Sequence, residues 1–344
     1  MWLKKSKGNH SPKVADILTR LMTSGVGLTI DELIQYKQKS SLINLAGVKN
    51  IQGRMSGNYL ARSKGRGMEF DEVRQYQNGD DIRTIDWRVT ARTGKTHTKL
   101  FREEIERPVL IATDLSSNML FGSQLLFKSV QAAHLSALVA WHTSLRGDRI
   151  GGVVFNEHQH HELKPRSRQQ GVLHYLHALM TTHENSEEEL RNSVIKTKQS
   201  EHALSFQQNC LRIRKIARPG SLVYLITDGY HLDQEAIRHL ASVSQHCELV
   251  VCLISDPLEH SLPVSSKRLN VNISDGINKQ QLTLGDKSVA ANYQQQAQHY
   301  IEKKERLLAK AGARLLHFSA GESLESQLKN GLFVNIIAAD NCNP

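Results

Sequence analysis

The stretch that decides the fold runs from Val109 to Gly122 and reads V-L-I-A-T-D-L-S-S-N-M-L-F-G. It begins as an apolar run, which is typical of a strand buried on both faces of a parallel sheet. The polar residues Asp114, Ser116 and Asn118 follow the run directly. In an open α/β sheet, ligands bind in the loops at the carboxyl ends of the strands. Oxygen-bearing side chains at alternate positions of such a loop can converge on Mg²⁺ or Mn²⁺, which prefer oxygen ligands.

From Val109 onward, strand-like segments alternate with helical patterns, which predicts an α/β fold with a doubly wound, mostly parallel sheet. The expected strands are 109–113, 149–155, 159–164 at an edge, 222–227, 248–254 and 314–318. The expected helices are 124–144, 169–180, 203–217, 234–245, 293–311 and 324–328. The polar, acidic residues 181–198 indicate a loop.

We expect four regions along the chain. Residues 1–50 form a basic, helical segment, within which Thr29 and Glu32 have the spacing of a helix capping box. Residues 51–108 form a small β-rich element that glycines divide into short segments. The sheet domain covers 109–335 and contains an excursion with hairpin character at about 256–286, and residues 336–344 form a tail.

The composition narrows the class of protein. The net charge is +10, and most of the excess lies in residues 1–107, which contain 20 basic and 12 acidic residues. The four cysteines lack C-x-x-C spacing, so neither a disulfide framework nor a zinc site is indicated. No apolar run approaches the roughly 20 residues of a membrane helix, and the first residues lack the apolar core of a secretory signal. A cytoplasmic location is therefore the default expectation.

Two apolar strands end in the same dipeptide, Thr113-Asp114 and Thr227-Asp228. If these strands are neighbours, both carboxylates lie at one edge of the sheet. Asp114, Ser116, Asn118 and Asp228 would then surround one oxygen-lined metal site. The alternative is that both aspartates only cap the helices that follow them.

Two features of the sequence resemble known families. The D-x-S loop at Asp114 and the later T-D-G at Asp228 resemble the von Willebrand factor A fold and its metal-ion-dependent adhesion site. The segment Gly65–Gly94, G-R-G-M-E-F-D-E-V-R-Q-Y-Q-N-G-D-D-I-R-T-I-D-W-R-V-T-A-R-T-G, is followed by K-L-F-R-E-E-I-E-R-P at Lys99–Pro108. Together these two segments resemble the bacterial family called domain of unknown function 58, and the resemblance runs from about Leu28 to the last strand.

The resemblance implies a function and a set of ligands. Members of this family are thought to act as adaptors beside MoxR-type AAA+ ATPases, in the assembly or maturation of client proteins, and no enzymatic activity is established for them. The implied Mg²⁺ ligands are Asp114, Ser116, Asp228 and a threonine, with Asn118 in place of the second serine. Thr197 is the candidate threonine, and Ser200, Thr181 and Thr182 stay open as alternatives. A partner's Asp or Glu would fill the open position on the metal.

A second candidate site lies in the β-rich element, where acids and arginines surround apolar side chains. One interpretation is an ion-paired cluster that holds a small β-rich subdomain against the sheet, and the other is a partner-facing surface. The residues of this surface are Arg74, Asp80, Asp81, Arg83, Asp86, Trp87 and Arg88.

Three other functions remain as alternatives. A metal-dependent phosphohydrolase could use Asp114 as its nucleophile. That reaction requires a second aspartate two residues later as the general acid and base, and Ser116 stands at that position. Nucleic-acid binding could use the basic N-terminal third, but nine acids lie among the twelve Lys and Arg of residues 51–107. The third is an A-type scaffold that binds its partner without metal. The run His158, His160 and His161 indicates an exposed edge strand rather than a soft-metal site.

Overall fold

The computed structural model describes residues 12–42, 68–103, 107–192, 199–263, 265, 268–274 and 279–330. The chain divides into two units, each described below by itself. Unit 1 comprises Met1–Asn44 and Arg107–Pro344, and unit 2 comprises Leu45–Glu106.

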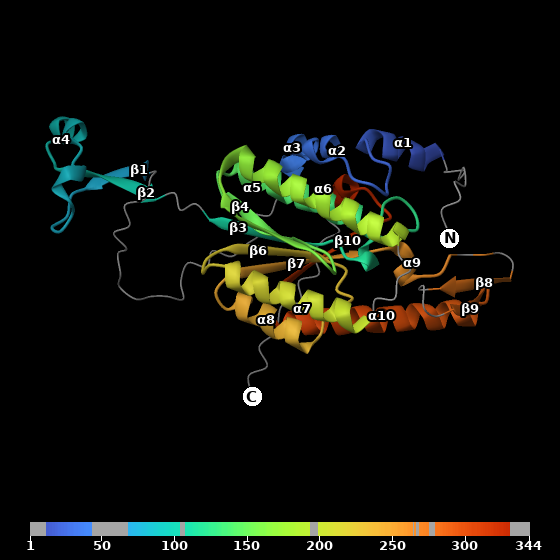
Figure 1. Cartoon of the computed structure of the whole chain (residues 1–344). Helices are drawn as coiled ribbons and strands as arrows, with labels where there is room; N and C mark the ends of the chain where they lie inside the picture. Colours follow the sequence, from blue (N-terminus) through green and yellow to red (C-terminus); the bar gives the residue numbers. More distant parts are fainter. Residues whose placement is uncertain are drawn as a thin grey trace. The chain divides into compact units, whose positions relative to one another are not determined.

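Unit 1 contains a six-stranded sheet in the order β10-β7-β6-β3-β4-β5 (Figure 1). Every pair of neighbours is parallel except β4 and β5, which pair antiparallel at one edge. The predicted doubly wound, mostly parallel α/β sheet is therefore confirmed. The strands are β3 (Pro108–Asp114), β4 (Arg149–Phe155), β5 (His160–Arg166), β6 (Leu222–Thr227), β7 (Glu248–Ser255) and β10 (Arg314–Ser319).

The two neighbours β3 and β6 form the point where the winding of the sheet reverses. After β3 the chain continues to β4 on one side, and after β6 it continues to β7 on the other. The loops that leave β3 and β6 therefore diverge to opposite sides at their carboxyl ends. This is the place at which open α/β sheets bind ligands.

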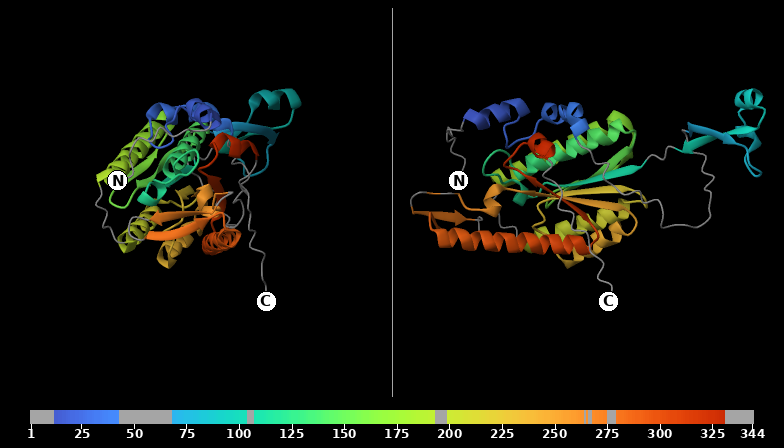
Figure 2. Two further views of the ribbon diagram at one scale, coloured as in Figure 1. Left: turned by 90° about the vertical axis from the view of Figure 1, so that its right-hand side faces the viewer. Right: turned by 180° about the vertical axis from the view of Figure 1, so that it is seen from behind.

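Helices cover both faces of the sheet (Figures 1 and 2). One face carries α5 (Lys128–Leu145) and α6 (Arg168–Asn192), and the other carries α7 (Gln199–Ile216), α8 (Gln234–Ser244) and α10 (Lys287–Lys310). The core on the second face joins apolar side chains of β3, β6 and β7 to those of α7 and α8. None of the helices in the described ranges combines the length and apolar character that crossing a bilayer requires.

The N-terminal helices also belong to unit 1. They are α1 (Pro12–Leu21), α2 (Ile30–Ile34) and α3 (Tyr36–Lys39), followed by a short 3-10 turn at Ser40–Leu42. The predicted capping box is confirmed, because the Thr29 side chain accepts from the Glu32 backbone and the Glu32 carboxylate accepts from the Thr29 backbone. The Glu32 carboxylate also bonds His134 of α5, and the Trp141 indole donates to the Leu33 carbonyl at 3.1 Å. These bonds fasten α2 to α5.

Unit 2 pairs β1 (Met68–Gln75) with β2 (His97–Glu103) in an antiparallel ribbon, as a β-rich element should. Between the strands lie a 3-10 turn (Ile82–Thr84) and α4 (Trp87–Thr93), which the sequence pattern did not predict. Asp86 begins α4 by accepting from the backbone N–H groups of Arg88 and Val89. Gly94, with a φ of +70°, ends α4 in the left-handed conformation.

The predicted loop at 181–198 is wrong as far as residue 192, because α6 continues to Asn192. The polar side chains Thr182, His183 and Ser186 are buried rather than exposed. Ser186 Oγ donates to the carbonyl of Leu115, in the loop after β3, at 3.0 Å. The polar composition alone indicated a loop, but in the structure these polar side chains are buried and form hydrogen bonds inside the fold. Residues 193–198 lie outside the described ranges.

The remaining elements follow the predictions closely. In the excursion, α9 (Pro257–His260) precedes a confirmed hairpin of β8 (Leu269–Ser274) and β9 (Lys279–Leu284). The helix α10 begins at Lys287, six residues earlier than expected, because Asp286 caps its first turn. The chain then forms β10 and α11 (Leu324–Asn330).

Candidate functional site at the edge between strands 3 and 6

Asp114 ends β3 at the edge where the winding reverses, and its side chain is 1% exposed. Thr227, the last residue of β6, donates its hydroxyl to Asp114 Oδ2 at 2.7 Å. The backbone N–H of Ser116 donates to Asp114 Oδ1 at 3.0 Å. Both carboxylate oxygens are thus fixed by the two strands that form the switch point. The strands β3 and β6 are neighbours, and Asp228 follows Thr227 directly, so both strand-end aspartates lie at the same edge of the sheet.

Burial, together with the negative charge of Asp228, raises the pKa of Asp114 to about 7. The hydrogen bonds from Thr227 and Ser116 oppose this rise without cancelling it. The carboxylate therefore lies in a place that favours a proton or a cation beside it.

A small cavity opens next to this carboxylate. Its volume is about 10 Å³, and Asp114, Ser116, Glu157 and His231 contribute to its lining. Such a space holds roughly one water molecule. The Ser116 hydroxyl is buried and has no hydrogen-bond partner among the described residues. A buried polar group without a partner is costly, so the cavity suits a small polar occupant.

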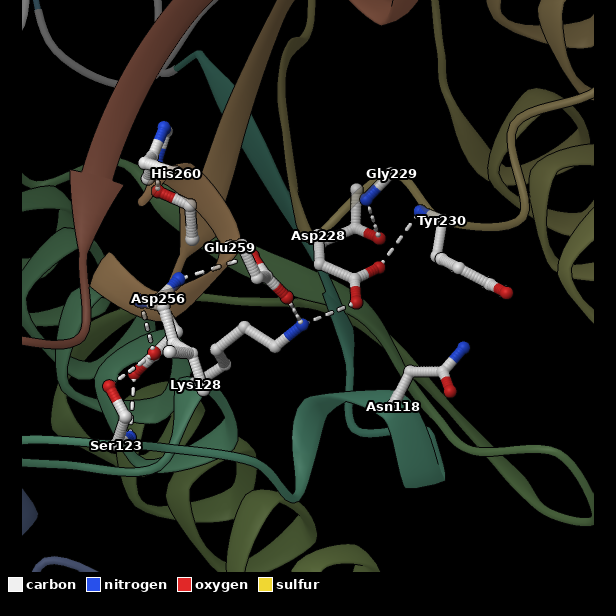
Figure 3. A network of polar contacts seen from close by, with 12 residues as sticks. Asn118, Ser123, Lys128, Asp228, Gly229, Tyr230, Asp256, Glu259 and His260 are labelled. Carbon is white, nitrogen blue, oxygen red and sulfur yellow. Dashed lines mark hydrogen bonds and ion pairs between the residues drawn. The ribbon is translucent and has the colours of Figure 1, made fainter. Parts of the chain in front are cut away.

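Asp228 faces a different neighbour (Figure 3). Its Oδ2 accepts a hydrogen bond from Lys128 Nζ at 2.8 Å, and its Oδ1 accepts from the Tyr230 backbone at 2.9 Å. Burial alone would raise the pKa of Asp228, but the ammonium of Lys128 and these hydrogen bonds hold it below its ordinary value. Lys128 is itself 3% exposed and also bonds Glu259 at 2.6 Å.

Asn118 and Thr197 are the two other predicted ligands. The Asn118 amide nitrogen donates to His231 Nε2 at 3.0 Å, so His231 links it to the cavity that Asp114 lines. Thr197 lies outside the described residues. Of the alternatives, Thr181 and Thr182 are part of α6 and Ser200 is part of α7.

The residues at this edge fit a divalent cation in part. The Asp114 carboxylate and the unpartnered Ser116 hydroxyl, beside a water-sized cavity, are oxygen groups of the kind that hard cations bind. Asp228 and Asn118 are instead engaged by Lys128 and His231. Over the ranges that the structure describes, no group of three or more His, Cys, Asp and Glu side chains is arranged to hold a metal ion.

Comparison with known proteins identifies the family. The model of the family described as "Protein of unknown function DUF58" matches residues 72–304, which is more than half of the chain. The chain belongs to this family. The family resemblance is thereby confirmed, with a match that begins within the Gly65–Gly94 segment and covers 72–304 of the predicted span from about Leu28 to the last strand.

Relatives of this DUF58 chain include uncharacterized proteins of Mycobacterium bovis and Mycobacterium tuberculosis. Each is 32% identical over 114 residues, which cover 33% of this chain and 36% of the relative. The match thus spans about a third of the length of these curated relatives. Among solved structures, a conserved hypothetical protein, BatB, from Bacteroides thetaiotaomicron is 15% identical with a TM-score of 0.30, covering 59% of this chain and 99% of its own. A von Willebrand factor type A protein from Catenulispora acidiphila is 12% identical with a TM-score of 0.33. The match covers 68% of this chain and 42% of that protein.

The second candidate site of this DUF58 chain lies in unit 2, where its acids have internal partners. Asp80 pairs with Arg74 at 2.7 Å, Asp81 accepts from the Arg83 backbone, and Asp86 caps α4. These acids are therefore engaged within unit 2, by an ion pair at Asp80 and by helix caps at Asp81 and Asp86. In contrast, Trp87 is 68% exposed, and Ile82, which the sequence-based site did not include, is 67% exposed. Arg83 and Arg88 are exposed beside them.

Sequence reasoning missed Lys128, Glu259 and His231 at the edge. Lys128 stands at the start of a helix whose next residues are almost all buried, and lysine is rarely buried unless it is paired. A charged residue heading an otherwise apolar helix was the available signal. The histidine run was interpreted correctly, because β5 is an edge strand in which His160 is exposed.

The raised pKa of Asp114 predicts how stability changes with pH. Because the folded-state pKa of about 7 exceeds the ordinary value of 3.8, the folded state binds this proton more tightly than the unfolded state does. The resulting stabilisation is complete below about pH 4 and is lost as the pH rises through 7, by up to about 4 kcal/mol. Asp114→Asn removes the titration and keeps the size of the side chain and one of its two acceptor oxygens.

Urea unfolding in metal-free buffer between pH 4 and pH 8 measures this effect. The free energy of unfolding of wild type should fall relative to Asp114→Asn as the pH rises. Parallel pH profiles for the two proteins would show that Asp114 does not titrate in this range.

Proposed function

We propose that this chain is a protein-interaction adaptor that binds partner proteins at the β3–β6 edge of its sheet. The observation that carries the proposal is the buried, hydrogen-bonded Asp114 beside the unpartnered Ser116 hydroxyl and a water-sized cavity. Such an arrangement holds a polar group in a fixed position at the place where sheets of this kind bind ligands. Membership of the DUF58 family and the mostly parallel sheet support a scaffold of this type.

In this proposal the edge binds Mg²⁺ or Mn²⁺ through Asp114 and Ser116. When bound, the ion supplies an open coordination position to an Asp or Glu of the partner. Asn118, Asp228 and Thr197 stay predicted ligands, of which Asn118 and Asp228 are held by other side chains in the structure. The metal-independent scaffold is the alternative, in which the same polar edge binds the partner directly.

The proposed partners are a MoxR-type AAA+ ATPase and a client protein, as the family resemblance implies. The exposed Trp87 and Ile82, with Arg83 and Arg88 beside them, are the proposed contact surface of unit 2, because tryptophan and arginine are enriched where interfaces gain most of their energy. We infer binding rather than catalysis, because Ser116 stands two residues after Asp114, where a phosphohydrolase of this type needs a second acid. The cytoplasmic location stays a prediction.

A pull-down with the full chain as bait, with and without Mg²⁺ and ATP, tests this function. We expect recovery of an AAA+ ATPase in Mg²⁺, and a loss of at least about tenfold in EDTA or with Asp114→Ala. Asp31→Ala, an exposed aspartate of α2, is the matched control and should bind as wild type does. Trp87→Ala examines the unit 2 surface in the same experiment.

The outcomes separate the alternatives. A complex that survives both EDTA and Asp114→Ala would contradict the metal-dependent proposal and favour the metal-independent scaffold. Recovery of nucleic acid with steep salt dependence would overturn the adaptor function altogether.

A further inference from the structure

Lys128 is a buried cation at the edge of the sheet. It is the first residue of α5 and is 3% exposed, yet it carries a charge that must be compensated. Its ammonium lies between two carboxylates, 2.8 Å from Asp228 Oδ2 and 2.6 Å from Glu259 Oε1 (Figure 3). These partners come from the end of β6 and from α9, so one lysine joins three elements at the carboxyl edge.

The surroundings of Lys128 are fixed rather than adaptable. Glu259 also accepts a hydrogen bond from the Asp256 backbone at 3.2 Å, within the capping box that begins α9. Asp256 in turn accepts from the backbone N–H of Ser123 at 2.8 Å, in the loop before α5. Charge-assisted bonds to a buried ammonium are strong and well oriented, and the buried partner here is Asp228, since the Glu259 side chain is 39% exposed. The ammonium therefore has one defined position.

The contacts of Asp228 orient its carboxylate toward this ammonium. Lys128 binds Oδ2 and the Tyr230 backbone binds Oδ1, so both oxygens are engaged. The cavity beside Asp114 and Ser116 is lined by other residues and not by Asp228. A second lysine, Lys304, already holds the Asp228 backbone by donating to its carbonyl at 2.9 Å. Lys128 is thus the lysine that hydrogen-bonds the carboxylate, whereas Lys304 acts on the carboxylate only through its charge.

We propose that the ammonium of Lys128 takes the place of a metal ion beside Asp228. It thereby keeps the Asp228 carboxylate from binding a cation in the pocket beside Asp114 and Ser116. The inference rests on the metal site of the proposed function and adds the residue that sets its affinity. A divalent ion in the pocket then meets the carboxylates of Asp114 and Glu157, which line it, but not the carboxylate of Asp228. Because affinity for hard cations rises with the number of charged ligands, Lys128 lowers the affinity of the edge for Mg²⁺ and Mn²⁺.

Mn²⁺ binding to the full chain, measured by the electron paramagnetic resonance of free Mn²⁺, tests this role. Lys128→Met removes the ammonium and frees Asp228, so Mn²⁺ should bind at least about tenfold more tightly than to wild type. The double variant Lys128→Met/Asp228→Asn should lose that gain. Glu259→Gln is the matched control, since it removes the other carboxylate and leaves Lys128 on Asp228. It should bind Mn²⁺ as wild type does.

A second comparison decides the matter if Lys128→Met does not fold. In the wild-type background, Asp228→Asn should change Mn²⁺ affinity by less than about threefold, whereas Asp114→Ala should abolish binding. Equal losses of Mn²⁺ affinity in these two variants would overturn the proposal. A folded Lys128→Met that binds Mn²⁺ no more tightly than wild type would also overturn it, and so would the absence of Mn²⁺ binding in both proteins. The proposed function fails separately, if the pull-down recovers no partner protein.

Discussion

Gly152→Ala is expected to lower the free energy of unfolding of unit 1 by at least about 3 kcal/mol, or to prevent folding. Gly152 lies in β4 beside Ile111 of β3, and a Cβ at this position would lie 1.9 Å from the Ile111 carbonyl oxygen. The obstacle is backbone, and β3 cannot move aside because β6 pairs with its other edge. A methyl group here would separate the two strands next to the candidate site.

Urea unfolding followed by far-ultraviolet circular dichroism measures this cost. Gly147→Ala is the matched control, because Gly147 has a φ of +80° but no atom within 4 Å of the added Cβ. Its cost should be only the about 1 kcal/mol of a left-handed alanine. Similar unfolding midpoints for the two variants would show that the strands adjust to the added methyl group.

Glu32→Ala should destabilise unit 1 by about 3–5 kcal/mol. Glu32 and His134 are both fully buried and bond each other between α2 and α5. Truncating Glu32 leaves the histidine without this partner, and its Nδ1 already has none among the described residues. It also removes half of the capping box at Thr29.

The same urea measurement, with Asp31→Ala as the control, tests the contribution of this pair. Asp31 precedes Glu32 in α2 but is exposed, so its loss should cost less than about 0.5 kcal/mol. A small effect of Glu32→Ala would mean that α2 adds little to the stability of the sheet.

The strands of unit 1 were predictable because an uninterrupted apolar run of this length is typical of a strand buried in a parallel sheet. Leu222–Thr227 is buried along its whole length, as an uninterrupted apolar run predicts for a central parallel strand. The two strand-end aspartates were likewise predictable as residues of one edge, because parallel neighbours end at the same edge. In contrast, Ser186 and its polar neighbours in α6 pack inside the fold, and polarity does not distinguish an exposed loop from a buried hydrogen-bonded helix.

The partners of the site residues were not predictable. Lys128 and Asp228 are 100 positions apart, and nothing local in the sequence indicates that their side chains meet. The same holds for Asn118 and His231, which are separated by 113 positions. A motif therefore identifies which residues reach an edge of the sheet, whereas tertiary packing decides which of them stay available to a ligand.

Arg107 connects the starts of the strands around β3. It directly precedes β3, and its backbone N–H donates to Asp148, ahead of β4, at 3.0 Å. Its guanidinium donates to the Gly220 carbonyl, ahead of β6, at 2.9 Å and to Glu248, at the start of β7, at 3.1 Å. One arginine thus ties four neighbouring strands together at the ends opposite the candidate site, which fixes the starting point of the strand that carries Asp114.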